Sequence, residues 1–110
     1  MGRGNTPEGK VKAAVKKVLA KYPDSYWRWP VPYGYGHSGL DCYGCHYGWF
    51  VSIETKAPGE KPTPRQTQDI REINIARGKA FVVDGPETLA RLEGSLEQVK
   101  TNESTGQSQA

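Results

Sequence analysis

The chain has 110 residues, of which 35% are hydrophobic and 25% are charged, and its mean hydropathy is −0.72. This length fits one domain with a modest core, expected at residues 1–100, and no apolar run approaches the roughly 20 residues that cross a membrane. Residues 1–10 lack the pattern of a signal peptide, and Cys42 and Cys45 lie too close in sequence to staple a fold. A cytoplasmic protein without a structural disulfide is therefore expected.

The net charge of +3 is mild, but the cations gather in two stretches. Such a distribution suits a polyanionic partner, and it is also typical of a solvated helix face. The cations are Lys10, Lys12, Lys16, Lys17 and Lys21 in the first expected helix, and Lys56, Lys61, Arg65 and Arg71 in the middle of the chain.

The run Thr-Pro-Glu at residues 6–8 has the signature of a helix start, with an N-cap, a proline at the first helical position and an acid facing the helix dipole. Apolar residues then recur at helical spacing until Pro23, which predicts a helix over residues 7–22. Glu8 lies on the same stripe as Val11, so it is expected to point toward the core side. It is either a site residue or an acid that only stabilises the helix start.

Residues 24–39 are rich in Tyr, Trp, Pro and Gly, which predicts irregular structure with a short edge strand at residues 26–29. The aromatic side chains could stack on nucleic-acid bases, and they could equally fill a small core. Ser38 and Gly39 would allow a phosphate backbone to approach closely.

Two apolar segments at residues 40–44 and 49–57, joined by a short turn, predict a β-hairpin. Because side chains alternate across a strand, Glu54 and Lys56 are expected on one face of the second strand. Pairing within the hairpin brings Asp41 close to this end.

Residues 63–66 (Thr-Pro-Arg-Gln) read as a capping box that starts a second helix, which we expect to end with Gly78 at its C-cap. A strand at residues 79–84, an amphipathic helix at 86–99 and a disordered polar tail at 101–110 follow. The order is one helix, three strands, a helix, a strand and a helix. It predicts an α/β fold with a small mixed central sheet, including the hairpin, flanked by helices.

A pair of carboxylates, Asp41 and Glu54, would repel each other a few ångströms apart unless a cation lay between them. Hard oxygen ligands indicate Mg²⁺ or Mn²⁺, with the backbone carbonyl of Thr55 as a further ligand. Phosphodiester hydrolysis needs such a metal and a nearby positive charge, which Lys56 supplies. Without a metal, Glu54 and Lys56 would form a solvent-exposed ion pair.

This string of residues resembles the PD-(D/E)xK nuclease superfamily, and within it the stand-alone VRR-NUC domain of phages and bacteria. The likeness covers roughly residues 6–93. Its motifs are Gly-Leu-Asp at 39–41, the run 48–56 ending in Glu-Thr-Lys, Thr-Pro-Arg-Gln at 63–66, Gly78 and the strand at 80–83. The sequence departs from the family at Leu40, where family members frequently have proline. This difference affects the local turn, but the acid that follows, Asp41, is retained.

The resemblance implies a restriction-endonuclease-like fold and a metal-dependent endonuclease that hydrolyses DNA. Asp41 and Glu54 match the metal-binding acids, and Lys56 matches the lysine that activates the attacking water. Glu8 matches an acid of the first helix that adds to the metal shell. Gln66 matches the glutamine that braces the site, a role compatible with its place in the capping box.

Stand-alone members of this branch are associated with homodimers and with branched DNA such as Holliday junctions, so the resemblance implies both for this chain. The expected contacts to the DNA backbone are Lys10, Ser38, Lys61, Arg65 and Arg71.

An alternative is a non-catalytic nucleic-acid-binding module stabilised by zinc. Cys42, Cys45 and His46, with His37 as the fourth ligand, would fill a tetrahedral site. The cysteines also suit the role of small buried hydrophobic residues, and His37 that of a hydrogen-bonded loop histidine. A third alternative is a nuclease of the same fold that cuts RNA.

Overall fold

The computed structural model describes residues 6–31 and 39–104. Within these ranges the chain forms three helices and four strands, in the predicted order. The elements are α1 (Pro7–Leu19), β1 (Tyr26–Arg28), β2 (Cys42–His46), β3 (Trp49–Thr55), α2 (Pro64–Ile75), β4 (Lys79–Val83) and α3 (Pro86–Ser104). None of these helices is long and apolar enough to cross a bilayer.

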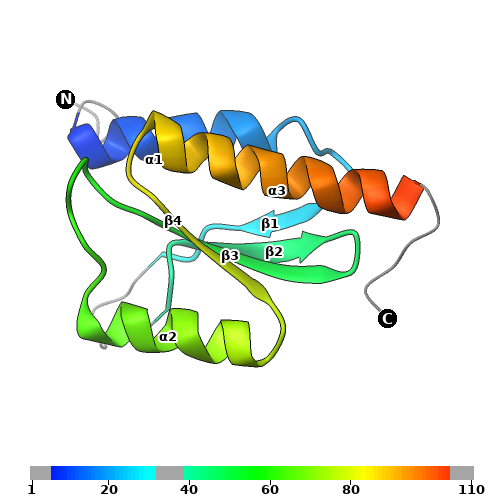
Figure 1. The fold of residues 1–110 in the computed structure, drawn as a ribbon. Coiled ribbons are helices and arrows are strands. Elements are labelled where there is room, and N and C mark those ends of the chain that lie inside the picture. Colours follow the sequence, from blue (N-terminus) through cyan, green and yellow to red (C-terminus); the bar gives the residue numbers. More distant parts are fainter. Residues whose placement is uncertain (1–5, 32–38, 105–110) are drawn as a thin grey trace.

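The four strands form one mixed sheet in the order β1-β2-β3-β4. β1, β2 and β3 are antiparallel neighbours, whereas the chain crosses over through α2 so that β4 runs parallel to β3. α1 and α3 cover one face of the sheet and α2 lies against the other (Figure 1). The prediction of a small mixed sheet flanked by helices is confirmed.

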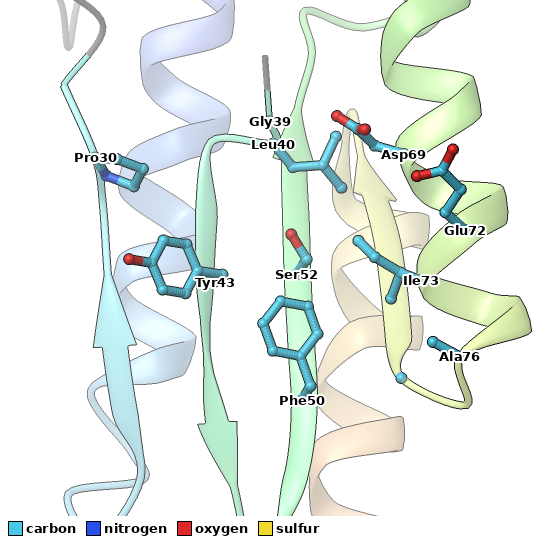
Figure 2. Close-up of a pocket in the computed structure, with 11 residues that line it drawn as sticks. Pro30, Gly39, Leu40, Tyr43, Phe50, Ser52, Asp69, Glu72, Ile73 and Ala76 are labelled. Carbon is cyan, nitrogen blue, oxygen red and sulfur yellow. The ribbon is translucent and has the colours of Figure 1, made fainter. Parts of the chain in front are cut away.

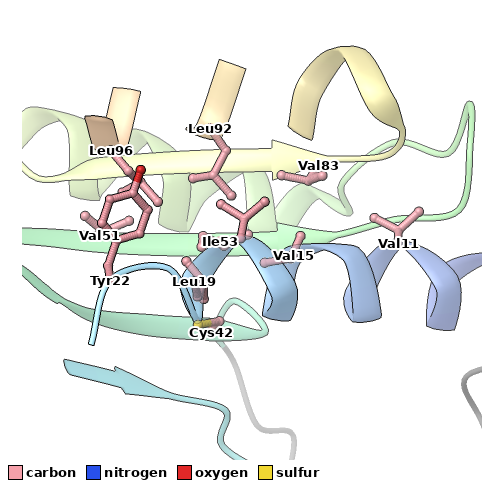
Figure 3. Packing of buried hydrophobic residues seen from close by; sticks show 11 residues of the cluster. Val11, Val15, Leu19, Tyr22, Cys42, Val51, Ile53, Val83, Leu92 and Leu96 are labelled. Carbon is pink, nitrogen blue, oxygen red and sulfur yellow. The ribbon is translucent and has the colours of Figure 1, made fainter. Parts of the chain in front are cut away.

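The hydrophobic core lies between the sheet and the layer of α1 and α3 (Figure 3). Val15 of α1, Ile53 of β3 and Leu92 of α3 are completely buried there. By contrast, α2 has no buried residue. Its face of the sheet is therefore only partly covered, and Tyr43 and Phe50 remain 41% and 46% exposed.

The hairpin turn consists of Tyr47 and Gly48, whose φ angles are both positive, at 50° and 87°. Positive φ at both central residues is the backbone of a type I′ turn, which matches the twist of the flanking strands. The turn thus occupies two of the four residues that separate the predicted strands. Because Cys42 pairs with Ile53, the residue before β2 lies beside the residue after Ile53.

Several element ends differ from the sequence prediction. α1 ends at Leu19 and not at Tyr22, because the proline that follows Tyr22 disfavours helical backbone in the residue before it. Tyr22 is nevertheless buried, with 3% of its surface exposed. At the other end of the chain, α3 continues to Ser104, since no proline or glycine interrupts residues 95–104. Residues 101–104 are therefore helical, and residues 105–110 of the expected tail lie outside the described ranges.

The end of α2 also differs from the prediction. Arg77, with φ of 72°, takes the left-handed position that was assigned to Gly78. The backbone N–H of Gly78 donates to the Ile73 carbonyl (2.9 Å) and that of Arg77 to the Asn74 carbonyl (3.1 Å), which is a Schellman motif. Gly78 is needed for space: a Cβ there would lie 2.9 Å from Ile73 Cγ2 and 3.2 Å from Phe50 Cδ2.

Candidate active site

The predicted acids and the lysine meet where β3 ends. The backbone N–H of Asp41 donates to Glu54 Oε1 (3.2 Å), and Lys56 Nζ lies 3.5 Å from Glu54 Oε2. The hairpin pairing places Asp41 next to Glu54, and one residue, Thr55, separates Glu54 from Lys56. The structure therefore brings these three residues together, as strand pairing predicted.

Glu54 is a buried carboxyl group, with only 2% of the residue exposed. Burial, and then the negative charge of Asp41, raise the pKa of Glu54 to about 7, while the Lys56 charge and the Asp41 N–H act in the opposite direction. The side chain of Lys56 is also largely covered, at 14% exposed. A solvent-exposed ion pair, the alternative role of Glu54 and Lys56, is therefore excluded.

The carboxylate of Asp41 is turned toward Thr55. Asp41 Oδ2 accepts hydrogen bonds from the Thr55 backbone N–H (2.9 Å) and from Thr55 Oγ1 (2.7 Å). Thr55 is completely buried, so these two bonds fix the orientation of the acid. Within the described residues we find no hydrogen bond to the other oxygen, Asp41 Oδ1.

Gln66 connects the start of α2 to the acids. Its Oε1 accepts from the Thr63 backbone N–H (2.9 Å) and Thr63 Oγ1 accepts from the Gln66 N–H (3.2 Å), which completes the predicted capping box. Its Nε2 donates to Glu54 Oε2 (2.8 Å). Both predicted contacts of Gln66 are thus present at once, because the amide has separate donor and acceptor atoms.

Glu8 does not take the expected position. It is exposed and faces no core residue, because it precedes Val11, the first buried residue of α1, by nearly one turn. In the described ranges, no group of three or more His, Cys, Asp or Glu side chains could hold a metal ion, so Glu8 does not join Asp41 and Glu54. Glu8 and Asp41 do line the same cavity, which has a volume of about 750 Å³.

Three residues that the sequence analysis did not assign to a site line the same cavity. Lys12 and Lys16 extend from α1 with their ammonium groups 5.8 Å and 5.0 Å from the ring centroid of Trp29. Trp29 is partly buried and packs against the core. The four-residue spacing from Glu8 through Lys12 to Lys16 was a signal for this shared helix face.

The residues predicted to contact DNA are distributed differently. Of the five, those that the structure describes do not line the cavity that contains Asp41. Ser38 lies outside the described residues. The other four are exposed: Lys10 on α1, Lys61 before α2, and Arg65 and Arg71 on α2.

The zinc site of the alternative hypothesis is not formed by the described residues. Cys42 is buried on the core face of β2, whereas Cys45 is exposed on the opposite face. Burial raises the pKa of the Cys42 thiol to about 12, so the thiolate that zinc requires is disfavoured. His46 is buried, with Nδ1 2.6 Å from Ser25 Oγ and Nε2 2.8 Å from the Leu96 carbonyl oxygen. His37 lies outside the described ranges.

A second cavity of about 470 Å³ lies on the α2 face of the sheet. Figure 2 shows Tyr43 of β2, Phe50 and Ser52 of β3, and Asp69 and Ile73 of α2 around it. The rings of Tyr43 and Phe50 are stacked with centroids 6.3 Å apart. The lining of this cavity is mainly apolar and includes none of the three residues that meet at the end of β3.

The donor set of Asp41 and Glu54 fits a hard divalent cation. Mg²⁺ is commonly held by one or two carboxylates, with water and substrate phosphates completing its shell. Two carboxylates opposite one ammonium group, that of Lys56, leave one negative charge when all three groups are ionised. A divalent cation would offset this charge and would favour the ionised form of Glu54, whose burial opposes it.

Comparison with known proteins does not assign the chain to a family: no protein-family model matches it, and no curated protein has a similar sequence.

Proposed function

We propose that the protein is a metal-dependent nuclease that hydrolyses DNA phosphodiester bonds, with a fold of the restriction-endonuclease type and a likeness to the VRR-NUC branch of the PD-(D/E)xK superfamily. One observation carries the proposal. At the end of β3 the buried carboxyl group of Glu54 lies 3.5 Å from the Lys56 ammonium group and accepts hydrogen bonds from the Asp41 backbone N–H and from Gln66, and the Asp41 carboxylate is close enough to raise the pKa of Glu54.

Each of these residues has a defined task in the proposed reaction. Mg²⁺ or Mn²⁺, when bound, polarises the phosphoryl oxygen and lowers the pKa of a coordinated water. Asp41 and Glu54 supply the carboxylate oxygens for the ion, with Asp41 Oδ1 pointing away from the bonds to Thr55. The Lys56 ammonium group offsets the negative charge that develops on the phosphate. Gln66 fixes the rotation of the Glu54 carboxyl group.

The test is cleavage of labelled DNA by wild type and by Lys56→Ala in Mg²⁺ or Mn²⁺. Loss of a positive charge that stabilises the transition state reduces turnover by about 100-fold or more, whereas binding is expected to change little. Lys17→Ala is the matched control, because Lys17 is an exposed lysine of α1 outside the site. It should cut like wild type.

Two outcomes would contradict the proposal. The first is cleavage by Lys56→Ala at the rate of the Lys17→Ala control. The second is the absence of any metal-supported cleavage by wild type across four-way junctions, flaps, nicked duplexes, linear duplexes and RNA strands. A preference for RNA in this panel would identify RNA as the substrate, and the proposed metal-dependent hydrolysis would still apply.

The proposal extends to branched DNA and to a homodimer, as the resemblance implies. Two sites related by a two-fold axis would suit paired cuts in a symmetric junction. A surface for a second copy is available on the sheet face that α2 leaves partly open, where Tyr26, Tyr43 and Phe50 are 53%, 41% and 46% exposed. Exposed aromatic patches of this kind commonly mark interfaces.

A further inference from the structure

The cavity beside Asp41 combines acids and lysines in one line. Glu8, Lys12 and Lys16 line it from α1, and Asp41 and Trp29 line it from the strand side. Residues four apart are neighbours on a helix surface, so the two lysines continue the row that begins with Glu8. The cavity therefore extends from Asp41 along α1.

The two lysines of this row are held in place by an aromatic ring and are not neutralised by an acid. Their ammonium groups lie 5.8 Å and 5.0 Å from the centroid of Trp29, whose position is fixed by packing against the core. Among residues 6–31 and 39–104, the salt bridges join Lys21 to Glu93 and Lys56 to Glu54, and neither involves Lys12 or Lys16. The positive charge at this end of the cavity is thus available to an anion.

We propose that Lys12 and Lys16, positioned by Trp29, bind phosphates of the nucleic-acid strand that continues from the scissile bond. This inference rests on the proposed nuclease function. A helix rises 1.5 Å per residue, so Lys16 lies roughly 12 Å along the axis from Glu8. One strand of B-form DNA carries a phosphate every 3.4 Å of the duplex axis, so for a strand that runs along α1 a contact at Lys16 falls within about four phosphates of Glu8.

The ligand is the sugar-phosphate backbone and not a particular base. Lysine acts as a flexible point charge toward phosphate, and such contacts position a strand without reading its sequence. Lys12 and Lys16 line the same cavity as Asp41, which favours a chain of phosphates over an isolated anion as the ligand. The exposed lysines predicted from sequence, such as Lys10, do not line this cavity.

The first experiment measures DNA binding by Lys12→Gln/Lys16→Gln over a range of salt concentrations, with divalent metal chelated. Loss of two phosphate contacts should weaken binding about tenfold or more and should lower the slope of log K against log [salt] by about 1.8 on duplex DNA or about 1.4 on single-stranded DNA. The control is Lys17→Gln/Lys100→Gln, which removes the same charge from positions that do not line the cavity. Circular dichroism confirms that each variant is folded.

The second experiment locates the contacts. Single phosphates on either side of the scissile bond are replaced by neutral methylphosphonates, and binding is measured with wild type and with Lys12→Gln/Lys16→Gln. At a phosphate that the lysines contact, the effects of the methylphosphonate and of the lysine substitutions on binding are not additive, because either change alone already removes the interaction. Non-additivity is expected within about four phosphates on one side of the cut. Repeating the measurement with single-stranded and with duplex substrates shows which form of the strand is bound.

The outcomes separate this inference from the function on which it rests. If wild type binds and cuts DNA but the double variant resembles the control, or if the changes are additive at every phosphate, the lysine row does not bind the strand. If wild type neither binds nor cuts any substrate, the nuclease proposal itself fails.

Discussion

Glu54 is held by contacts from three separate parts of the chain. The Asp41 N–H comes from before β2, Gln66 Nε2 from the first turn of α2, and Lys56 from two residues further along the strand. These contacts were predictable, because a hairpin with a short turn fixes which residues face each other and a capping box fixes where a helix begins. The sequence could not predict how deeply Glu54 is buried, since burial depends on how α2 and its preceding loop pack.

The misplacement of Glu8 has a physical explanation. Counting by three from Val11 assigns Glu8 to the core face, but a helix face is buried only where another element covers it. The buried part of α1 starts at Val11, so Glu8 lies before it and is exposed. The neighbours of Glu8 on the helix surface are therefore the residues at four-residue spacing. The spacing of Lys12 and Lys16 indicated a shared helix face, but no local pattern indicates that Trp29 lies beside them.

A pH prediction concerns His46. Burial lowers the pKa of this side chain, the neighbouring Lys100 charge acts in the same direction, and the Leu96 carbonyl and Glu97 partly oppose both. As the pH falls through the ordinary histidine pKa of about 6.5, the unfolded chain takes up a proton that the folded chain does not. This part of the folding free energy is therefore fully present above pH 6.5 and is lost below it, with a limiting slope of about 1.4 kcal/mol per pH unit.

Urea unfolding at several pH values between 5 and 8 tests this. His46→Gln should be less stable than wild type at pH 8 but should lose less stability on acidification. His37→Gln is the control, since it removes the only other histidine of the chain. The explanation is wrong if His37→Gln flattens the pH profile and His46→Gln does not.

At the scale of elements, the spacing of apolar residues and the capping residues predicted the order and type of the helices and strands. The residues at which the elements end depend on three-dimensional geometry, which the sequence pattern does not contain. The end of α2 is the clearest case. A glycine after a helix usually supplies the left-handed residue, yet here Arg77 does so and Gly78 provides the room for Phe50 and Ile73. Only the path of the chain from α2 into β4 distinguishes these two positions.

This arrangement predicts opposite effects at adjacent positions. Arg77→Gly should raise the free energy of unfolding by about 1 kcal/mol, because glycine has no Cβ to disfavour the left-handed conformation. Gly78→Ala should lower it by about 1–3 kcal/mol, because the new Cβ would lie 2.9 Å from Ile73 Cγ2. Chemical denaturation of each variant measures both.

Gly94→Ala is a matched control for the second change. Gly94 lies within α3, and a Cβ there meets no atom within 4 Å, so alanine should stabilise the helix by about 0.5–1 kcal/mol. Equal effects of alanine at positions 78 and 94 would show that space at Gly78 is not limiting.

For the whole molecule, the two faces of the sheet differ in how completely they are covered. α1 and α3 cover one face, which holds the core, and α2 lies against the other (Figure 1). On the face toward α2, Tyr26, Tyr43 and Phe50 are exposed. Strand alternation predicted which residues share a face. It could not predict that α2 would pack mainly over β4 and leave the rings of β1 to β3 uncovered, because that depends on the three-dimensional path of the crossover.

If the aromatic face is the dimer interface, Phe50→Ser should shift the protein toward the monomer in sedimentation equilibrium. Loss of a large aromatic side chain from an interface commonly weakens association by at least about 2 kcal/mol, or roughly thirtyfold. Ile75→Ser is the control, since Ile75 of α2 is more exposed, at 72%, and does not belong to this face. If only Ile75→Ser causes dissociation, the interface lies elsewhere. If the wild type is monomeric at tens of micromolar, the proposed dimer is excluded.

The bond from Gln66 to Glu54 has a consequence for when the protein becomes competent. The same side chain closes the first turn of α2 and holds the buried acid, so the orientation of Glu54 depends on the formation of α2. An incompletely folded chain, such as one still emerging from the ribosome, would lack a correctly oriented acid. Under the proposed function, DNA cleavage would therefore appear only once α2 has formed.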